Sequence, residues 1–158
     1  MGLIYKQERI GKGGKPFVIY KIRTMDENQE IKRQPIERDE NDSRIMPGRK
    51  FLRKWGIDEF PQILNVLKGE MKIVGPRPLT KDAYEMLPDD LKKEREKQKP
   101  GFVPPQYAHA ELDTHKIKGW VEAERRYWKE RKKSPFRTDL KYLLKVVANF
   151  ALGRAKSR

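Results

Sequence analysis

The sequence contains no cysteine and only two histidines among its 158 residues. The absence of cysteine excludes disulfide bonds, thiolate chemistry and cysteine-ligated metal sites, and it suits a reducing compartment. His109 and His115 both fall in an expected loop, with Glu111 and Asp113 close by. Their spacing matches no strong metal-binding signature, so we interpret them as incidental loop histidines.

The sequence also lacks long hydrophobic runs. None approaches the roughly 18 consecutive apolar residues that a membrane-spanning helix needs, and the N-terminus has no apolar core of a signal peptide. We therefore do not expect the chain as given to span a bilayer. Its 37 Lys and Arg against 23 Asp and Glu give a net charge of +14. Such an excess predicts attraction to a membrane surface, a nucleic acid or phosphorylated substrates.

The length fits one domain, residues 1–158, with a thin core because the apolar fraction is low. Residues 3–10 and 17–25 are rich in β-branched and aromatic side chains and predict two strands. The glycine-rich stretch 11–16 between them predicts the turn of a hairpin. It does not fit a Walker phosphate loop. Residues 26–41 are almost entirely polar, and we expect a mobile surface loop there.

The rest of the chain predicts helices, so the expected fold class is α+β: a mainly helical domain with a small N-terminal hairpin. A basic helix follows Pro47, and a second helix begins near Asp58 and ends at Gly69. A short strand is expected at 71–74 and an interrupted helical region at 79–98. Its charged run, 89–97, is interpreted as a solvated face.

Residues 102–114 are expected to form a loop, and two amphipathic helices follow it. In the last helix, Ser134 or Thr138 is the expected cap. The expected apolar stripe of that helix consists of Leu140, Leu143, Leu144, Val147 and Ala151.

Asp58 and Glu59 form an acidic pair in the first turn of an expected helix. Acidic side chains are common there because they interact favourably with the helix dipole. The same N–H groups and nearby cations would also hold a carboxylate ionised, so Asp58 is a candidate nucleophile. Glu59 is a candidate ligand for a hard cation such as Mg²⁺. Adjacent helical side chains diverge by about 100°, which suits two separate roles.

Three cations are candidate phosphate ligands. Arg77 lies between Pro76 and Pro78, which restrict the backbone on both sides and leave the guanidinium little freedom to lose. An ordinary surface role for Arg77, in a loop stiffened by the two prolines, is an equally good interpretation. Lys21 and Arg23 alternate along the second strand and therefore share a face. They would bind phosphate only if that face lies near the acidic pair.

Six ordered motifs resemble those of the bacterial sugar transferases known as monotopic phosphoglycosyl transferases. They occupy residues 6–11, 17–25, 48–53, 58–62, 65–71 and 74–78. The resemblance is close from Tyr5 to Leu79 and looser around residues 99–101 and from Asp139 onward.

The resemblance implies a two-step reaction. Asp58 would attack the β-phosphorus of a UDP-sugar and release UMP, and a polyprenol phosphate would then take the sugar-1-phosphate from the aspartyl intermediate. Glu59 would bind Mg²⁺ and Arg77 would clamp the diphosphate. The product would start the assembly of a polysaccharide or glycoconjugate.

The resemblance also implies a place in the cell, the cytoplasmic face of the bacterial inner membrane. The family normally carries a membrane-embedded helix just before the position of Tyr5, so we expect this sequence to be the catalytic core without that helix, peripheral as it stands. The basic helix and the C-terminal helix could rest on an anionic membrane surface, and core packing is the alternative for the apolar stripe of the C-terminal helix. At residues 102–110 the sequence departs from the family's usual nucleotide-sugar loop.

Two alternatives remain open on the sequence. One is a family member that keeps the scaffold, has lost activity and acts as an interaction partner. The other is a nucleic-acid-binding domain, which rests on charge alone. No helix-turn-helix, zinc-finger or RNA-binding signature is present, so no nucleic-acid partner is expected.

Overall fold

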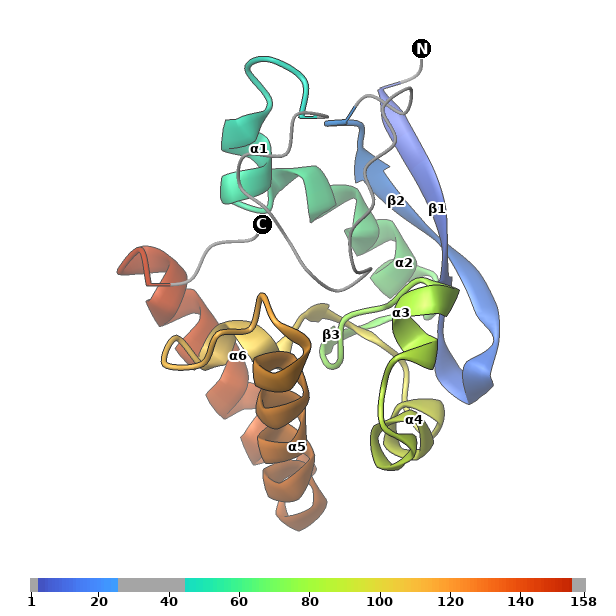
Figure 1. Cartoon of the computed structure of the whole chain (residues 1–158), viewed down its shortest axis with the longest axis vertical. Helices are drawn as coiled ribbons and strands as arrows, with labels where there is room; N and C mark the ends of the chain where they lie inside the picture. Colours follow the sequence, from blue (N-terminus) through green and yellow to red (C-terminus); the bar gives the residue numbers. More distant parts are fainter. Residues whose placement is uncertain (1–2, 26–44, 155–158) are drawn as a thin grey trace.

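The computed structural model describes residues 3–25 and 45–154 (Figure 1), so the loop expected at 26–41 lies outside the described residues. The N-terminal hairpin is confirmed. Strands β1 (Ile4–Ile10) and β2 (Pro16–Ile22) pair antiparallel, with Ile4 opposite Ile22 and Ile10 opposite Pro16. The glycine-rich turn between them forms a short 3₁₀ helix, η1 (Lys12–Gly14).

The segment that carries the acidic pair consists of three short helices. These are α1 (Lys50–Lys54), the 3₁₀ helix η2 (Ile57–Gln62) and α2 (Ile63–Leu67). Gly56 joins α1 to η2 with a φ of 69°, a conformation that glycine adopts without strain. The single helix expected from Asp58 onward therefore begins as a 3₁₀ helix. Pro61 lies within it and has no N–H to donate to an α-helical bond.

A second small sheet lies in the middle of the chain. The expected strand is confirmed as β3 (Lys72–Val74), and it pairs in parallel with β4 (Gly101–Val103), which falls in a region expected to be a loop. The close approach requires glycine, because a Cβ on Gly101 would overlap the backbone of Gly75. The Gly101 N–H also donates to the Pro76 carbonyl at 2.9 Å. This contact anchors the loop that carries Arg77.

The interrupted helical region is confirmed as α3 (Lys81–Glu85) and α4 (Asp89–Glu96). The solvated-face interpretation of the charged run is wrong for Arg95, whose side chain is buried. A 3₁₀ helix, η3 (Pro105–Ala108), and the long helices α5 (Ile117–Lys133) and α6 (Pro135–Ala151) complete the chain. In Figure 1, α5 and α6 pack side by side, and α4 lies on the far side of α5 from α6.

The main hydrophobic core lies between these helices and β3. Its buried members are Val74, Leu79, Ala83, Leu87, Leu91, Ala108, Trp120, Val121, Tyr127, Trp128, Tyr142 and Val146.

The apolar stripe expected on α6 supplies that core only in part. Leu143 packs against it, but Leu140, Leu144 and Val147 are exposed. The residues of α6 that are buried are Thr138, Tyr142 and Val146. Ser134 occupies the cap position but makes no capping side-chain hydrogen bond. No helix in the described ranges 3–25 and 45–154 is long and apolar enough to cross a membrane.

A buried amide joins the hairpin to the helix that follows the acidic pair. Asn65 is 0% exposed, and its Nδ2 donates to the Val18 carbonyl at 2.7 Å and to Glu70 Oε2 at 2.8 Å. Its backbone carbonyl accepts the N–H groups of Glu70 and Met71 at 2.9 and 3.1 Å. One residue therefore fixes α2 against β2 and shapes the turn into β3.

Replacing this amide should loosen the attachment of α2 to the hairpin. We expect Asn65→Ala to lower the free energy of unfolding by about 2 kcal/mol, because two buried hydrogen bonds are lost and the Val18 carbonyl is left without this donor. Urea denaturation measures the loss. Glu70→Gln is the matched control, since its amide oxygen can still accept the Asn65 N–H, and it should lose less than half as much. Equal losses in the two variants would contradict the role assigned to Asn65.

Candidate functional site

The acidic pair lies at the start of η2, where strand β2 of the hairpin packs against it. Asp58 is only 7% exposed. The left-handed Gly56 immediately before η2 turns the chain, and the Glu59 N–H donates to the Gly56 carbonyl at 3.1 Å. The pair is therefore held on a short, tightly turned segment rather than on the first turn of a regular α-helix.

Glu59 is bound by two cations, Arg77 and Lys21. Its Oε2 accepts a hydrogen bond from Arg77 Nη1 at 2.8 Å, and its Oε1 accepts from Arg77 Nη2, which makes the pair bidentate. Lys21 Nζ lies 3.3 Å from Oε1. The structure thus brings Lys21, Glu59 and Arg77 together, although they are 38 and 18 residues apart in sequence. Bidentate guanidinium–carboxylate pairs are among the stronger hydrogen-bonded ion pairs.

Arg77 also touches a residue that sequence reasoning did not select. Its Nη1 donates to the Tyr107 hydroxyl at 3.2 Å. Burial alone lowers the pKa of Arg77, but the negative charges of Glu59 and Asp58 and the nearby Tyr107 raise that pKa overall. The guanidinium therefore stays charged inside the protein. Tyr107 falls in the loop that departs from the family pattern, and no local sequence signal marks it as a neighbour of Arg77.

Burial raises the pKa of Asp58, and the neighbouring Glu59 charge raises it further. Lys21, Arg53 and Arg77 act in the opposite direction. We expected cations and helix N–H groups to keep the carboxylate ionised, and the cations do favour the charged form. Desolvation outweighs them because Asp58 is buried. Arg53, interpreted from sequence only as part of a basic helix face, is therefore an electrostatic neighbour of the acidic pair.

Arg23 shares a face of the hairpin with Lys21, as the alternation predicts. Its guanidinium lies over the Tyr5 ring, 5.2 Å from the centroid, and Tyr5 is directly opposite Lys21 in the strand register. Its backbone carbonyl accepts a hydrogen bond from Arg49 Nη1. Arg23 thus lies next to Lys21 on the sheet, whereas the contacts with Glu59 are made by Lys21 and Arg77.

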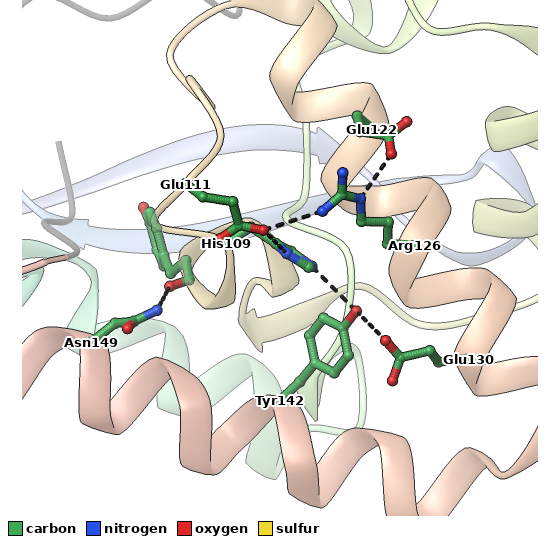
Figure 2. A network of polar contacts seen from close by, with 8 residues as sticks. His109, Glu111, Glu122, Arg126, Glu130, Tyr142 and Asn149 are labelled. Atoms are coloured by element: carbon green, nitrogen blue, oxygen red, sulfur yellow. Dashed lines mark hydrogen bonds and ion pairs between the residues drawn. The ribbon is translucent and has the colours of Figure 1, made fainter.

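One of the two histidines, His109, belongs to a buried polar network. His109 is buried, with Nδ1 3.1 Å from Glu111 Oε1 and Nε2 3.2 Å from the Tyr142 hydroxyl (Figure 2). Tyr142 in turn donates to Glu130 Oε1 at 3.4 Å, so this network links the loop after η3 to α5 and α6. Burial raises the pKa of Tyr142, and so does the Glu130 charge. His109 is thus a packed structural residue of that loop.

A metal ion at the acidic pair would depend on few protein ligands. In the part of the chain that the structure describes, no three His, Cys, Asp or Glu residues gather into a metal-binding group. The carboxylate oxygens of Asp58 and Glu59 are nevertheless donors that Mg²⁺ prefers, and Mg²⁺ is usually held by one or two carboxylates together with substrate phosphates. The donor set therefore fits a Mg²⁺ ion that arrives with a phosphorylated substrate.

Comparison with known proteins finds similarity to bacterial sugar transferases. A sequence model of the family described as "Bacterial sugar transferase" matches residues 1–153. The UDP-glucose:undecaprenyl-phosphate glucose-1-phosphate transferase of Escherichia coli is 44% identical over 78 residues, which cover 48% of this chain and 16% of that protein. The undecaprenyl-phosphate galactose phosphotransferase of Salmonella typhimurium is 43% identical over 102 residues, which cover 56% of this chain and 21% of that protein.

A more distant relative matches more of this chain. The UDP-N-acetylgalactosamine-undecaprenyl-phosphate N-acetylgalactosaminephosphotransferase of Aeromonas hydrophila is 32% identical over 125 residues, covering 79% of this chain and 26% of that protein. In all three relatives the match spans about a quarter or less of the relative's own length. The family match extends over nearly the whole chain and confirms the resemblance carried by the six motifs. The chain belongs to the bacterial sugar transferase family.

Proposed function

We propose that this chain transfers a sugar-1-phosphate from a UDP-sugar to a polyprenol phosphate, with Asp58 as the nucleophile. The observation that carries the proposal is a buried aspartate beside a glutamate held by Arg77 and Lys21. The three relatives are each named for undecaprenyl phosphate, which supports a polyprenol phosphate acceptor. Two of the names include a UDP-sugar, which supports that donor.

The proposed reaction has two displacements at one phosphorus atom. In the first, an Asp58 carboxylate oxygen bonds to the β-phosphorus while the bond from that phosphorus to the bridging oxygen breaks, and UMP leaves with the electron pair. In the second, a phosphate oxygen of the polyprenol phosphate attacks the same phosphorus and Asp58 leaves as a carboxylate. The product is a polyprenol diphosphosugar. A covalent carboxyl–phosphate intermediate divides one difficult transfer into two easier steps.

Arg77 and Lys21 would provide the charge that the diphosphate needs. Both now contact Glu59, so the entering diphosphate would compete with that carboxylate for the guanidinium. Bidentate geometry suits phosphate as well as carboxylate, so Arg77 could exchange one partner for the other without a large movement. Arg23, next to Lys21 on the hairpin, would extend the positive surface toward the substrate.

Glu59, once released by Arg77, is the residue that would hold Mg²⁺. Bound there with the substrate phosphates, the ion would neutralise charge on the leaving phosphate. Tyr107 keeps a hydroxyl beside Arg77 and limits the positions that the guanidinium can take.

A lipid acceptor requires the site to lie near a membrane surface. The helices around Asp58 expose several large apolar side chains, namely Phe51, Trp55, Phe60, Leu64 and Leu67. The same segment carries Arg49, Lys50, Arg53 and Lys54. Apolar and basic side chains together are typical of segments that lie on anionic lipid. This combination supports a position at the membrane surface, which we propose is the cytoplasmic face of the inner membrane.

Replacing the nucleophile should remove the covalent step. With UDP-sugars, Mg²⁺ and a short polyprenol phosphate in detergent, the wild type should release UMP. Asp58→Asn should reduce release by at least about 10³-fold, because an amide cannot form the acyl phosphate. Mass spectrometry should find a phosphosugar adduct on the wild type and none on the variant.

Asp82→Asn is the matched control, since it makes the same change at an exposed position on α3. It should keep the wild-type rate. An adduct that survives Asp58→Asn would show that another group is the nucleophile. Absence of UMP release by the wild type across several sugars would favour the inactive scaffold instead.

The rate should depend on pH through Asp58. Because burial raises the pKa of Asp58 and only the carboxylate attacks, the first step should slow as pH falls through a value above the ordinary carboxyl range. Arg53→Gln removes a cation that lowers this pKa, so its acid limb should lie at higher pH than that of the wild type. The measurement is kcat/KM for UMP release against pH.

Lys54→Gln removes a neighbouring charge that is not among the main causes of the pKa shift of Asp58, and it serves as the control. Its acid limb should coincide with the wild-type limb. Equal shifts in both variants would show that the net charge of α1, rather than the position of Arg53, sets the profile.

Membrane binding should depend on the exposed apolar side chains near Asp58. Phe51 and Leu67 are 60% and 78% exposed, so replacing both with serine should leave the fold intact. Sedimentation with anionic vesicles should show binding reduced by about tenfold or more, from the lost burial of two large side chains. Ile73→Ser, at a 57% exposed position on β3, is the control and should bind as the wild type does. Unchanged binding of the double variant would exclude this face.

A further inference from the structure

A buried ion pair lies behind Arg77, between α4 and α5. Arg95 and Glu124 are 6% and 0% exposed. Arg95 Nε donates to Glu124 Oε1 at 2.7 Å, and Nη2 donates to Oε2 at 2.7 Å. The remaining Nη1 donates to the backbone carbonyl of Arg77 at 2.9 Å. The fork of the guanidinium therefore joins a carboxylate on α5 to the main chain of the loop that carries Arg77.

Glu124 reaches Arg77 by a second route as well. Its Oε2 accepts from Gln106 Nε2 at 3.3 Å, and Gln106 is buried in η3. The next residue is Tyr107, whose hydroxyl accepts from Arg77 Nη1. Glu124 also accepts from Trp128 Nε1 at 3.2 Å, which secures the carboxylate on its own helix. One carboxylate thus constrains the backbone of Arg77 through Arg95 and the guanidinium through Gln106 and Tyr107.

This arrangement calls for an explanation beyond stability. Removing two charges from water is unfavourable, and a well-packed apolar pair in the same place often stabilises a protein as well or better. The apolar alternative would provide no N–H for the Arg77 carbonyl and no acceptor for Gln106. The ion pair therefore provides directional hydrogen bonds that an apolar pair would lack. Those hydrogen bonds act on one residue of the site, Arg77.

We propose that Glu124 is a positioning residue for Arg77, acting through Arg95 and through η3. The inference rests on the proposed function, because it concerns the guanidinium that would bind the diphosphate. A guanidinium displaced by about 1 Å can slow a reaction by about 10²-fold without loss of the fold. Glu124 itself touches neither the acidic pair nor the proposed substrate position.

The test replaces both charged partners at once, with Arg95→Met and Glu124→Leu in the same chain. Because no unpaired charge is left buried, the double variant should fold, although the lost partners of Gln106, Trp128 and the Arg77 carbonyl should make it less stable than the wild type. We expect kcat for UMP release to fall by about tenfold or more, with KM changed much less. A merely structural pair would leave the kcat of a folded variant unchanged.

Asp90→Asn is the matched control. Asp90 on α4 and Arg125 on α5 form an exposed pair at 3.0 Å between the same two helices, without contact with the Arg77 loop. This variant should keep the wild-type kcat.

If the double variant does not fold, Arg95→Lys decides the question. The lysine keeps a positive charge beside Glu124. Its single ammonium group, however, cannot bind both that carboxylate and the Arg77 carbonyl as the planar guanidinium does. A folded double variant or Arg95→Lys protein with the wild-type kcat would overturn the assignment. Inactivity of the wild type would instead reject the proposed function.

Discussion

The ion pair between Glu59 and Arg77 joins two parts of the chain that are built in different ways. Glu59 lies on η2, which packs against the hairpin, whereas Arg77 lies on the loop that leaves β3 and is supported by the helices. The two side chains are 12% and 10% exposed, so solvent screens their attraction only weakly. The pair neutralises a carboxylate directly beside Asp58, and without it the repulsion between the adjacent acids would be larger.

Buried polar groups hold each partner of this ion pair in place. On the hairpin side, the Asn65 amide bonds the Val18 carbonyl, and on the helical side Arg95 bonds the Arg77 carbonyl. The main apolar core lies among the helices and β3. With 36% hydrophobic residues, the chain has little apolar surface with which to position the site. Directional hydrogen bonds perform that task, since each one fixes a distance and an angle that apolar contacts leave loose.

Local patterns predicted the hairpin, the breaks at Pro88 and Gly69, and the helices, because turn residues and periodicity act over short distances. Lys21, Glu59 and Arg77 were selected from motif and resemblance, and the structure places them together. Strand β4 was not predicted because a three-residue strand is too short to show an alternating pattern, and β3, with which it pairs, is distant in sequence. The roles of Tyr107 and Arg95 also depend on tertiary contacts that no local pattern encodes. The pKa of Asp58 is raised because burial, which sequence gives poorly, outweighs the cations.

The charges that act on Asp58 set a limit on how the proposed reaction can proceed. Lys21, Arg53 and Arg77 lower the pKa of Asp58, while Glu59 raises it. A diphosphate that takes Arg77 from Glu59 adds negative charge and also frees a second carboxylate next to the nucleophile. Both changes would raise the pKa of Asp58 and favour its unreactive protonated form. A cation that arrives with the substrate would oppose that rise in pKa, and a Mg²⁺ ion held by Glu59, as proposed above, would be such a cation.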